Sequence, residues 1–446
     1  MSGVYFVSLG CPKNLVDTEV LAGILLSSGR NITFDAKEAD VYLINTCAFL
    51  PSAREEAFEE IRKAVNWKKR ARKQSRRIVV AGCLPQYGTD NPFKDKFPEV
   101  DFWLGVNDIP EIAEILQNKE CSDASKSAPA YLYDHSTPRL QLTVPHMAYL
   151  KIADGCNNCC TYCAIPHIRG KLRTRSQASV VEEAKNLIAN GVKELVIVAQ
   201  DVTVFGHDRP DSGENLSTLL RELDKIDGEF KMRLLYTHPA HYTDELIETL
   251  KNSKHVMHYL DMPLQHISDR ILKAMNRHVT QERVREVIAG LRKAMPDLVL
   301  RTTFITGFPG ESEAEFEELK EFIREMRFER CGVFPYSAEP GTKAAEMAGQ
   351  IDFEVACERA DELMEIQTSI MDEYQHSMIG KVIEVIADDA ENSRAIGRGV
   401  ADAPEIDNMV VFGGRRLKTG KVYNVRIEAV SDFDLIGNVI ETEKKK

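Results

Sequence analysis

The stretch GCNNCCTYC, residues 155–163, places four cysteines within nine residues and is the strongest indication of the fold class. It follows an apolar run at residues 148–153 that is typical of a β-strand. Cys156, Cys160 and Cys163 have the spacing C-x3-C-x2-C. Three thiolates on one loop can each bind one iron of a [4Fe-4S] cluster and leave the fourth iron without a protein ligand. The open iron can bind S-adenosylmethionine, whose reductive cleavage yields a 5'-deoxyadenosyl radical.

Structural zinc is the alternative interpretation of the same residues. Cys156 with Cys159, and Cys160 with Cys163, also form two C-x2-C pairs. Zinc pairs usually come from separated loops, whereas this arrangement would require the adjacent Cys159 and Cys160 both to turn inward. The preceding strand and the α/β pattern that follows favour the iron-sulfur cluster, which leaves Cys159 as a bystander thiol.

Strands and helices alternate on the C-terminal side of this motif. The strand candidates are residues 148–153, 195–199, 233–236, 259–262, 299–305 and 332–334. Helical patterns separate them and give about six βα units, fewer than the eight of a closed barrel. We therefore expect a partial (βα)6 barrel over residues 145–376.

The N-terminal segment, residues 1–120, predicts an α/β domain with a doubly wound parallel sheet. The runs VYFVSLG, VYLINTC and RIVVAGC alternate with helical patterns at residues 14–28 and 52–73. Cys11, Cys47 and Cys83 lie at the ends of these runs, and the carboxyl ends of parallel strands meet at one edge of a sheet. We therefore expect the three thiols to converge and hold a second cluster, although each alone would be an ordinary buried thiol. We keep that ordinary interpretation for the remaining cysteines, Cys121, Cys331 and Cys357.

The C-terminal segment has a different pattern of short strands and turns. KVIEVIAD, RAIGRGV, MVVFG, KVYNVRIEAV and LIGNVI are five strand candidates over residues 377–441, which indicate a small all-β barrel of OB-like shape. Residues 121–144 are rich in Ser, Ala and Pro, lack periodicity and are predicted to be a linker. Residues 442–446 form a short tail.

Composition narrows the class of protein. Ten cysteines in 446 residues are too few for a disulfide framework and point to metal binding or catalysis. No run approaches the ~20 apolar residues that span a bilayer, and no signal peptide is evident, so we expect a cytoplasmic protein with no membrane partner. The net charge of -12 disfavours broad electrostatic binding to nucleic acid.

Together these segments resemble the methylthiotransferase family of radical S-adenosylmethionine enzymes, over essentially the whole chain. The resemblance rests on SLGCPKNLVDTE, LINTCAF, GCNNCCTYCAIP and LDMPLQHISD. The last stretch is similar to the RimO-type branch, which methylthiolates a ribosomal protein, whereas members that modify transfer RNA usually carry a QSGS-like run. The resemblance implies a C-terminal TRAM domain, two [4Fe-4S] clusters and two uses of S-adenosylmethionine. One molecule methylates a sulfur at the N-terminal cluster, and the other yields the radical that removes a substrate hydrogen.

The resemblance also implies where the cofactor binds. Tyr162 is the aromatic residue before the last cysteine of the motif. Gln200 and Asp201 follow the second barrel strand, and Gly307 and Glu311 belong to TGFPGE after the fifth; all are expected beside the cofactor. Taken alone, TGFPGE is interpreted equally well as a Gly/Pro turn before a helix.

The substrate implied by the resemblance is an aspartate β-carbon in the twelfth small-subunit ribosomal protein. Asp261, Gln265 and His266, at the fourth strand end, are expected to face it, His266 only as pocket lining. An electron donor and a sulfur donor are further expected partners. The alternatives are a transfer RNA adenosine methylthiotransferase and, in a different class, a nucleic-acid-binding module with structural zinc.

Charge bears on the choice between the first two substrates. Residues 377–440 carry eight basic and ten acidic side chains, which favours docking on a basic ribosomal protein over gripping transfer RNA. A competing signal is a basic face on the helix that starts near Ser52, predicted to be either solvent-exposed or a contact to ribosomal RNA or the loaded substrate. Its members are Lys68, Lys69, Arg72, Lys73 and Arg76.

Overall fold

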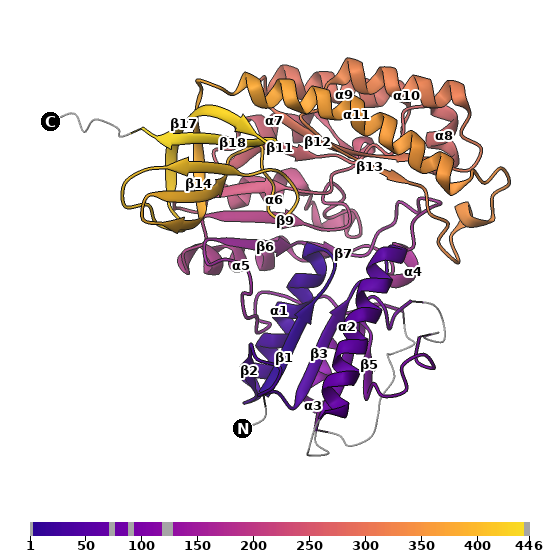
Figure 1. Ribbon diagram of the computed structural model, residues 1–446, viewed down its shortest axis with the longest axis vertical. Coiled ribbons are helices and arrows are strands. Elements are labelled where there is room, and N and C mark those ends of the chain that lie inside the picture. The colour runs from indigo at the N-terminus through magenta and orange to yellow at the C-terminus, as the bar shows by residue number, and fades with distance from the viewer. Residues whose placement is uncertain (1–2, 71–75, 88–92, 118–127, 441–446) are drawn as a thin grey trace.

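The computed structural model describes residues 3–70, 76–87, 93–117 and 128–440, which form three packed bodies (Figure 1). An N-terminal α/β body lies below a larger body built on six parallel strands, and a small all-β barrel lies beside the larger one (Figure 1). The three-part fold class expected from the sequence is confirmed. Within the described ranges, no helix combines the length and the apolar character that a membrane span requires.

The N-terminal body is a parallel sheet in the order β2-β1-β3-β4-β5. The three apolar runs of the sequence form its central strands, while the edge strands β2 and β5 have only three residues each and were not predicted. Helices α1 and α2 each begin with a proline, whose fixed φ and missing N–H suit the first helical turn. The elements are β1 Gly3–Ser8, α1 Pro12–Ser27, β2 Asn31–Thr33, β3 Val41–Thr46, α2 Pro51–Lys69, β4 Arg77–Gly82, β5 Phe102–Leu104, a 3-10 turn Val106–Glu111 and α3 Ile112–Ile115.

The prediction of a basic face on α2 is wrong in part. Helix α2 ends at Lys69, so Arg76 lies beyond it and packs its guanidinium 4.4 Å from the Trp67 ring centroid. Lys68 pairs with Asp101 at 2.6 Å, and Lys69 pairs with Glu99 at 2.8 Å. Arg72 and Lys73 lie outside the described residues. Because its two described lysines are already paired with acids, this face is weak support for an RNA contact.

The central body is the expected partial barrel of six parallel strands, in the order β6-β9-β10-β11-β12-β13. A two-stranded antiparallel pair, β7 Ala153–Asp154 with β8 Arg173–Thr174, flanks the cysteine loop. The barrel strands are β6 Met147–Lys151, β9 Glu194–Val198, β10 Lys231–Leu234, β11 Val256–Asp261, β12 Val299–Thr306 and β13 Arg330–Pro335. The helices are α4 Ile165–Ile168, α5 Gln177–Ala189, α6 Leu216–Leu223, α7 Asp244–Asn252, α8 Asp269–Ala274, α9 Gln281–Ala294, α10 Glu313–Met326 and α11 Phe353–Ser377.

Local sequence signals start most of these helices. A Ser, Thr or Asn precedes each of α5 to α10, and its side chain accepts a hydrogen bond from a backbone N–H in the first turn. Each cap satisfies a donor that would otherwise remain unpaired at the helix start. The capping residues are Ser176, Asn215, Thr243, Ser268, Thr280 and Ser312.

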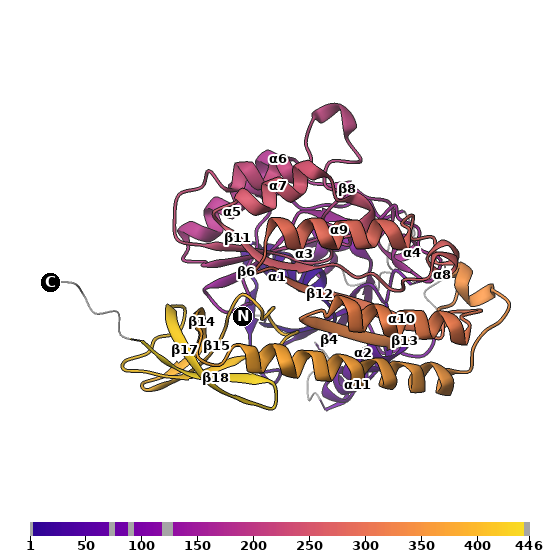
Figure 2. The ribbon, with the colours of Figure 1, turned by 90° about the horizontal axis from the view of Figure 1, so that it is seen from above.

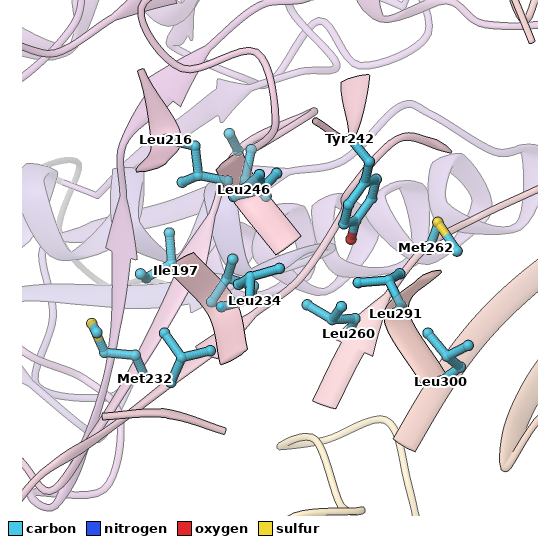
Figure 3. Packing of buried hydrophobic residues seen from close by; sticks show 14 of the residues in the cluster. Ile197, Leu216, Met232, Leu234, Tyr242, Leu246, Leu260, Met262, Leu291 and Leu300 are labelled. Carbon is cyan, nitrogen blue, oxygen red and sulfur yellow. The ribbon is translucent and has the colours of Figure 1, made fainter. Parts of the chain in front are cut away.

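The two faces of the barrel sheet belong to different cores. Leu195 and Ile197 on β9 face the surrounding helices, and Figure 3 shows this packing around Leu234, Leu260 and Leu300. Figure 2 shows the helices on the outside of the sheet. The intervening β9 residues point to the opposite face and join a second core, which includes helix α1 of the N-terminal body. Side chains alternate between the two faces along each strand, so one face packs on the helices and the other on the N-terminal body. The first two bodies therefore share one continuous apolar core.

The predicted linker contains no helix or strand in its described residues 128–144, yet it is packed against both bodies. Tyr133 is 3% exposed. Arg139 pairs with Glu19 of α1 at 2.5 Å and with Glu183 of α5 at 2.6 Å. Residues 128–144 form a strap that fixes the N-terminal body to the barrel.

The C-terminal body is a closed five-stranded barrel, as expected. Its strands pair in the order β14-β15-β16-β18-β17 and enclose a core of their own. The loop between β15 and β16, residues 399–409, reaches under the central barrel, where Ala401 and Ala403 join the core shared by the first two bodies. The strands are β14 Val382–Glu391, β15 Arg394–Arg398, β16 Val410–Gly413, β17 Val422–Ser431 and β18 Asp434–Val439.

Buried ion pairs anchor this loop to the bottom of the central barrel. Glu194 is 1% exposed, binds Arg233 at 2.8 Å and also pairs with Arg398. Burial alone would raise the pKa of Glu194, but the two guanidinium groups lower it below its usual value. Arg233 in turn donates to the carbonyls of Gly399 and Val400. The small barrel is therefore rigidly joined to the central one.

Removing the central carboxylate of this network is expected to destabilise the protein. Glu194→Gln keeps the size of the side chain but leaves two buried guanidinium groups without their shared anion. We expect a loss of about 3 kcal/mol in the free energy of unfolding. Glu222→Gln, which breaks an exposed pair with Lys225, is the control and should cost less than about 0.5 kcal/mol. Urea unfolding of both variants tests this, and equal losses would contradict a stabilising role for the buried network.

Candidate functional site

The cysteine loop leaves the barrel directly after β7. Gly155 begins it with φ of +76°, and a Cβ there would lie 2.1 Å from the carbonyl oxygen of Lys171, so only glycine fits. Cys156, Cys160 and Cys163 are each partly buried. Cys159 is exposed, unlike the other three cysteines of the loop, and its φ of 51° lies in the left-handed region. The position of Cys159 disfavours the paired zinc arrangement.

Hydrogen-bond donors point at the sulfurs of this loop. The backbone N–H of Asn158 donates to Cys156 Sγ at 3.4 Å, and Arg277 Nη1 donates to Cys160 Sγ at 3.7 Å. Burial raises the pKa of Cys156 and of Cys163 to about 12, so a metal must displace their protons. N–H donors around partly buried thiols are the surroundings that iron-sulfur clusters use. The residues present therefore fit a [4Fe-4S] cluster.

The second cysteine group lies where three adjacent strands of the N-terminal sheet end. Cys11, Cys47 and Cys83 follow β1, β3 and β4, which are neighbours in the sheet. Gly10 has φ of +90°, and a Cβ there would lie 2.5 Å from Cys47 Cβ, so the chain can turn only at glycine. Burial raises the pKa of Cys83 to about 12. The structure thus brings together the three cysteines that the sequence singled out.

The other cysteines lie elsewhere. Cys331 is on β13 and Cys357 on α11, outside both groups, and Cys121 falls outside the described residues.

Arg169 of the barrel connects the two cysteine groups. It follows α4, six residues after Cys163, and is 2% exposed. Its Nη2 donates to Cys83 Sγ at 3.3 Å, and its Nη1 binds Asp17 of α1 at 2.5 Å and Asp154 of β7 at 3.1 Å. One guanidinium group therefore links the N-terminal cysteine edge to the strand that carries the cysteine loop.

Gln200 and Asp154 extend this network toward the expected cofactor site. The Gln200 side-chain amide donates to Asp154 at 2.7 Å. Burial alone would raise the pKa of Asp154, but Lys151, Arg169 and Arg173 lower it far below its usual value. The Gln200 side chain is thus held against Asp154, the residue that precedes the cysteine loop.

Asp201 holds the cysteine loop directly. Its carboxylate accepts a hydrogen bond from the Asn158 side chain at 2.7 Å and another from the Thr203 N–H at 2.9 Å. Sequence reasoning missed two neighbours, His238 and His241, which follow the third barrel strand. His241 Nε2 lies 3.2 Å from Asn158 Oδ1, and the three side chains Asp201, His238 and His241 could hold a cation. The sequence HPAH at a strand end was the available signal.

The TGFPGE loop is held by its own glutamate. Glu311 accepts from the Gly307 N–H at 3.1 Å and binds Arg359 at 2.6 Å. His266 Nε2 lies 3.4 Å from the same carboxylate, and the fully buried ring accepts a hydrogen bond from the Ser268 N–H. Burial alone would raise the pKa of Glu311, but these contacts lower it. Glu311 and His266 therefore shape this loop from inside, while Tyr162 packs against the nearby apolar cluster around Phe308.

Asp261 occupies the fourth strand end, as expected. Its carboxylate is buried, binds Arg301 at 2.9 Å and accepts the Tyr236 N–H at 3.0 Å. Its backbone carbonyl accepts the N–H of Thr237. Asp261 therefore ties the third, fourth and fifth barrel strands together where they end.

Gln265 follows the same strand end and is held by its backbone. Its φ of 74° lies in the left-handed region. Its N–H donates to the carbonyl of Thr303, and its carbonyl accepts the N–H of Ile305, so it bonds with β12 on both sides. Gln265 thus helps to fix the strand ends near the cysteine loop.

A groove lies at the other end of the barrel. Its volume is about 980 Å³, and it runs between the amino ends of β9 to β11 and the small C-terminal barrel, with Lys193, Lys231 and Lys421 among its lining residues. The cysteine loop leaves the carboxyl ends of the strands, so this groove is not the radical site.

Three family models match the chain. The radical SAM superfamily matches residues 150–323, the uncharacterized protein family UPF0004 matches residues 3–105, and the TRAM domain matches residues 379–440.

Curated relatives match over nearly the full length. The ribosomal protein uS12 methylthiotransferase RimO of Heliobacterium modesticaldum is 42% identical over 98% of this chain and 95% of its own length. The protein of the same name from Geobacter sulfurreducens is 43% identical over 98% of both chains.

Solved structures of lower similarity share the fold. The radical S-adenosylmethionine methyltransferase TsrM of Kitasatospora setae has a TM-score of 0.56 at 14% identity, over 75% of this chain and 73% of its own. The cobalamin-dependent S-adenosylmethionine radical enzyme OxsB has a TM-score of 0.54 at 12% identity, over 84% of this chain and 56% of its own.

Proposed function

The chain belongs to the RimO family of ribosomal protein uS12 methylthiotransferases, and we propose that it attaches a methylthio group to an aspartate β-carbon of uS12, the twelfth small-subunit ribosomal protein. The observation that carries this proposal is identity of 42% across 98% of the chain. Such a match spans the N-terminal body, the barrel and the C-terminal body together. The reaction is a sulfur-group transfer at a carbon that carries no acidic proton, which acid-base catalysis cannot activate at neutral pH.

Membership of the radical S-adenosylmethionine superfamily implies one [4Fe-4S] cluster and S-adenosylmethionine. When bound, they supply the one-electron chemistry that takes a hydrogen from an unactivated carbon. We assign the ligand role to Cys156, Cys160 and Cys163. Asp201 holds the loop that carries them by accepting from Asn158, and the positive Arg277 donates to Cys160. Gln200 donates to Asp154 just before the loop.

A second [4Fe-4S] cluster on Cys11, Cys47 and Cys83 forms the other half of the proposal. Its support is the convergence of three thiols on adjacent strand ends, with the Arg169 guanidinium donating to one of them. This edge would hold the sulfur to be transferred, next to the barrel edge that generates the radical. An electron donor and a sulfur donor complete the proposed partners, and we propose that the enzyme works in the cytoplasm.

The transfer RNA branch receives less support. The charge difference counted in the sequence includes Asp388, Asp402, Asp407 and Arg398, which form internal ion pairs or hydrogen bonds. Seven basic and seven acidic side chains of the C-terminal body remain, so its charge favours neither substrate. The choice of uS12 therefore rests on the relatives and not on charge.

Mass spectrometry of uS12 tests the proposed function. Ribosomes from a strain that lacks this chain should carry unmodified uS12, and expression of the wild-type chain should add one methylthio group to one aspartate. Transfer RNA nucleosides from the same cells provide the comparison. Restored methylthio-adenosine with unchanged uS12 would instead identify the transfer RNA activity.

A further inference from the structure

Lys13 is a buried cation at the boundary between the N-terminal body and the barrel. It is the second residue of α1, two positions after Cys11, and its side chain is 9% exposed. The ammonium nitrogen lies 3.4 Å from the centroid of the Tyr236 ring. Among the residues that the structure describes, no hydrogen bond or ion pair involves this nitrogen. A buried charge of this kind is costly unless an anion pairs with it.

Two carboxylates of this region, Asp261 and Asp17, already have other partners. Asp261 binds Arg301 at 2.9 Å and the Tyr236 N–H at 3.0 Å. Asp17, one turn along α1, pairs with Arg169 at 2.5 Å and with Lys151. Lys13 thus has no hydrogen-bonded or ion-paired anion among the described residues, and the face of the Tyr236 ring is its electrostatic contact there.

Lys13 lies between the two proposed cluster sites, the N-terminal cysteine edge and the strand ends of the barrel. The residue belongs to the N-terminal cysteine edge, while Tyr236 lies two residues after the end of β10, at the carboxyl end of the barrel strands. Tyr236 is fixed in a turn with φ of 63°, and its carbonyl accepts the N–H of Val202, two residues after Gln200. A ligand held by the ammonium group would therefore lie between the proposed sulfur-bearing edge and the radical-generating edge.

We infer that Lys13 binds the side-chain carboxylate of the target aspartate. This inference rests on the proposed function and names a specificity-determining residue for it. The β-carbon of aspartate is bonded directly to the carboxylate carbon. A carboxylate held at Lys13 therefore also fixes the position of the reacting β-carbon, one bond away from the carboxylate carbon. The pairing also gives this buried ammonium group the anion that the described residues do not bring within ion-pair distance. An adenine base offers no carboxylate, so the same residue selects against it.

The experiment compares two forms of uS12, one with the target aspartate and one with asparagine in its place. Both retain β C–H bonds, but only the first carries the anion. Wild-type enzyme should methylthiolate the aspartate form with kcat/KM about 100-fold above that of the asparagine form. In Lys13→Met the preference should disappear, because activity on the aspartate form falls by about the same factor. Lys13→Arg keeps the charge and should retain a preference for aspartate.

Three further measurements separate substrate binding from support of the N-terminal cluster. Iron content and 5'-deoxyadenosine formation without uS12 should match the wild type in Lys13→Met. Lys96→Met is the matched control, because Lys96 also lies over an aromatic ring, 3.8 Å from the centroid of Phe58, on the N-terminal body. It should leave kcat/KM for both substrates unchanged.

Two results would overturn the inference. One is a Lys13→Met enzyme that still prefers aspartate, and the other is a wild-type enzyme that modifies both forms equally. The wild-type comparison keeps the inference testable even if Lys13→Met loses iron or folds poorly. A wild-type enzyme that modifies neither form would instead contradict the proposed function itself.

Discussion

Replacing Cys156, Cys160 and Cys163 together by alanine is expected to abolish 5'-deoxyadenosine formation and to halve the iron content. The anaerobically reconstituted wild-type chain should hold about eight irons, and the variant about four. The physical reason is that these three are the partly buried thiols of the cysteine loop, and donors from Asn158 and Arg277 reach two of them. Iron analysis and chromatography of the cleavage products measure both effects.

Cys159→Ala is the matched control for this variant. Its thiol is exposed and lies between two proposed ligands in the sequence, so its removal changes the same loop without removing a ligand. Iron content and S-adenosylmethionine cleavage should stay at the wild-type level. A triple variant that still forms 5'-deoxyadenosine would show that the radical site has been assigned to the wrong residues.

Replacing Cys11, Cys47 and Cys83 by alanine should abolish methylthio transfer and leave S-adenosylmethionine cleavage intact. These thiols end three neighbouring strands of a different body, and the cysteine loop of the barrel keeps its own ligands and its contacts with Asp201. The variant should therefore hold about four irons and form 5'-deoxyadenosine that is not coupled to product. Mass spectrometry of uS12 together with quantification of 5'-deoxyadenosine checks both halves of the expectation.

Folding must be verified before this result is interpreted, because Cys83 also accepts a hydrogen bond from Arg169 in the buried network. Circular dichroism should show unchanged secondary structure. Cys331→Ala, which removes a cysteine of β13 outside both groups, should retain full methylthio transfer. Wild-type product formation by the triple variant would mean that Cys11, Cys47 and Cys83 are core thiols.

The strands were predictable from the sequence wherever a strand is central to its sheet. Central strands are buried on both faces, so β3 and β9 appear as continuous apolar runs such as VYLINT and ELVIV. The edge strands β2 and β5 are too short to carry such a signal. The N-terminal cysteine group was predictable for a related reason, because parallel strands end at a common edge. The cysteines of the barrel loop were predictable from their spacing within one short segment.

The polar partners of these cysteines were not predictable from the sequence. Arg169 reaches Cys83 across 86 positions of the chain, and Lys13 meets Tyr236 of another body. Such contacts depend on how two bodies pack, which no local pattern encodes. The predicted linker shows the same limit, because its composition indicates irregular backbone but not the ion pairs of Arg139 with Glu19 and Glu183.

The shared interior beneath the barrel sheet has a consequence for synthesis of the chain. Val16 and Leu21 of α1 belong to the same core as Tyr149, Tyr259 and Ala403, so the first body to leave the ribosome cannot fully bury its α1 face until the last domain has been made. Contacts between residues this far apart in sequence slow folding, and an exposed apolar face favours aggregation in the meantime. The nascent N-terminal body therefore depends on its distant partners, or on a chaperone that covers the same face, throughout translation.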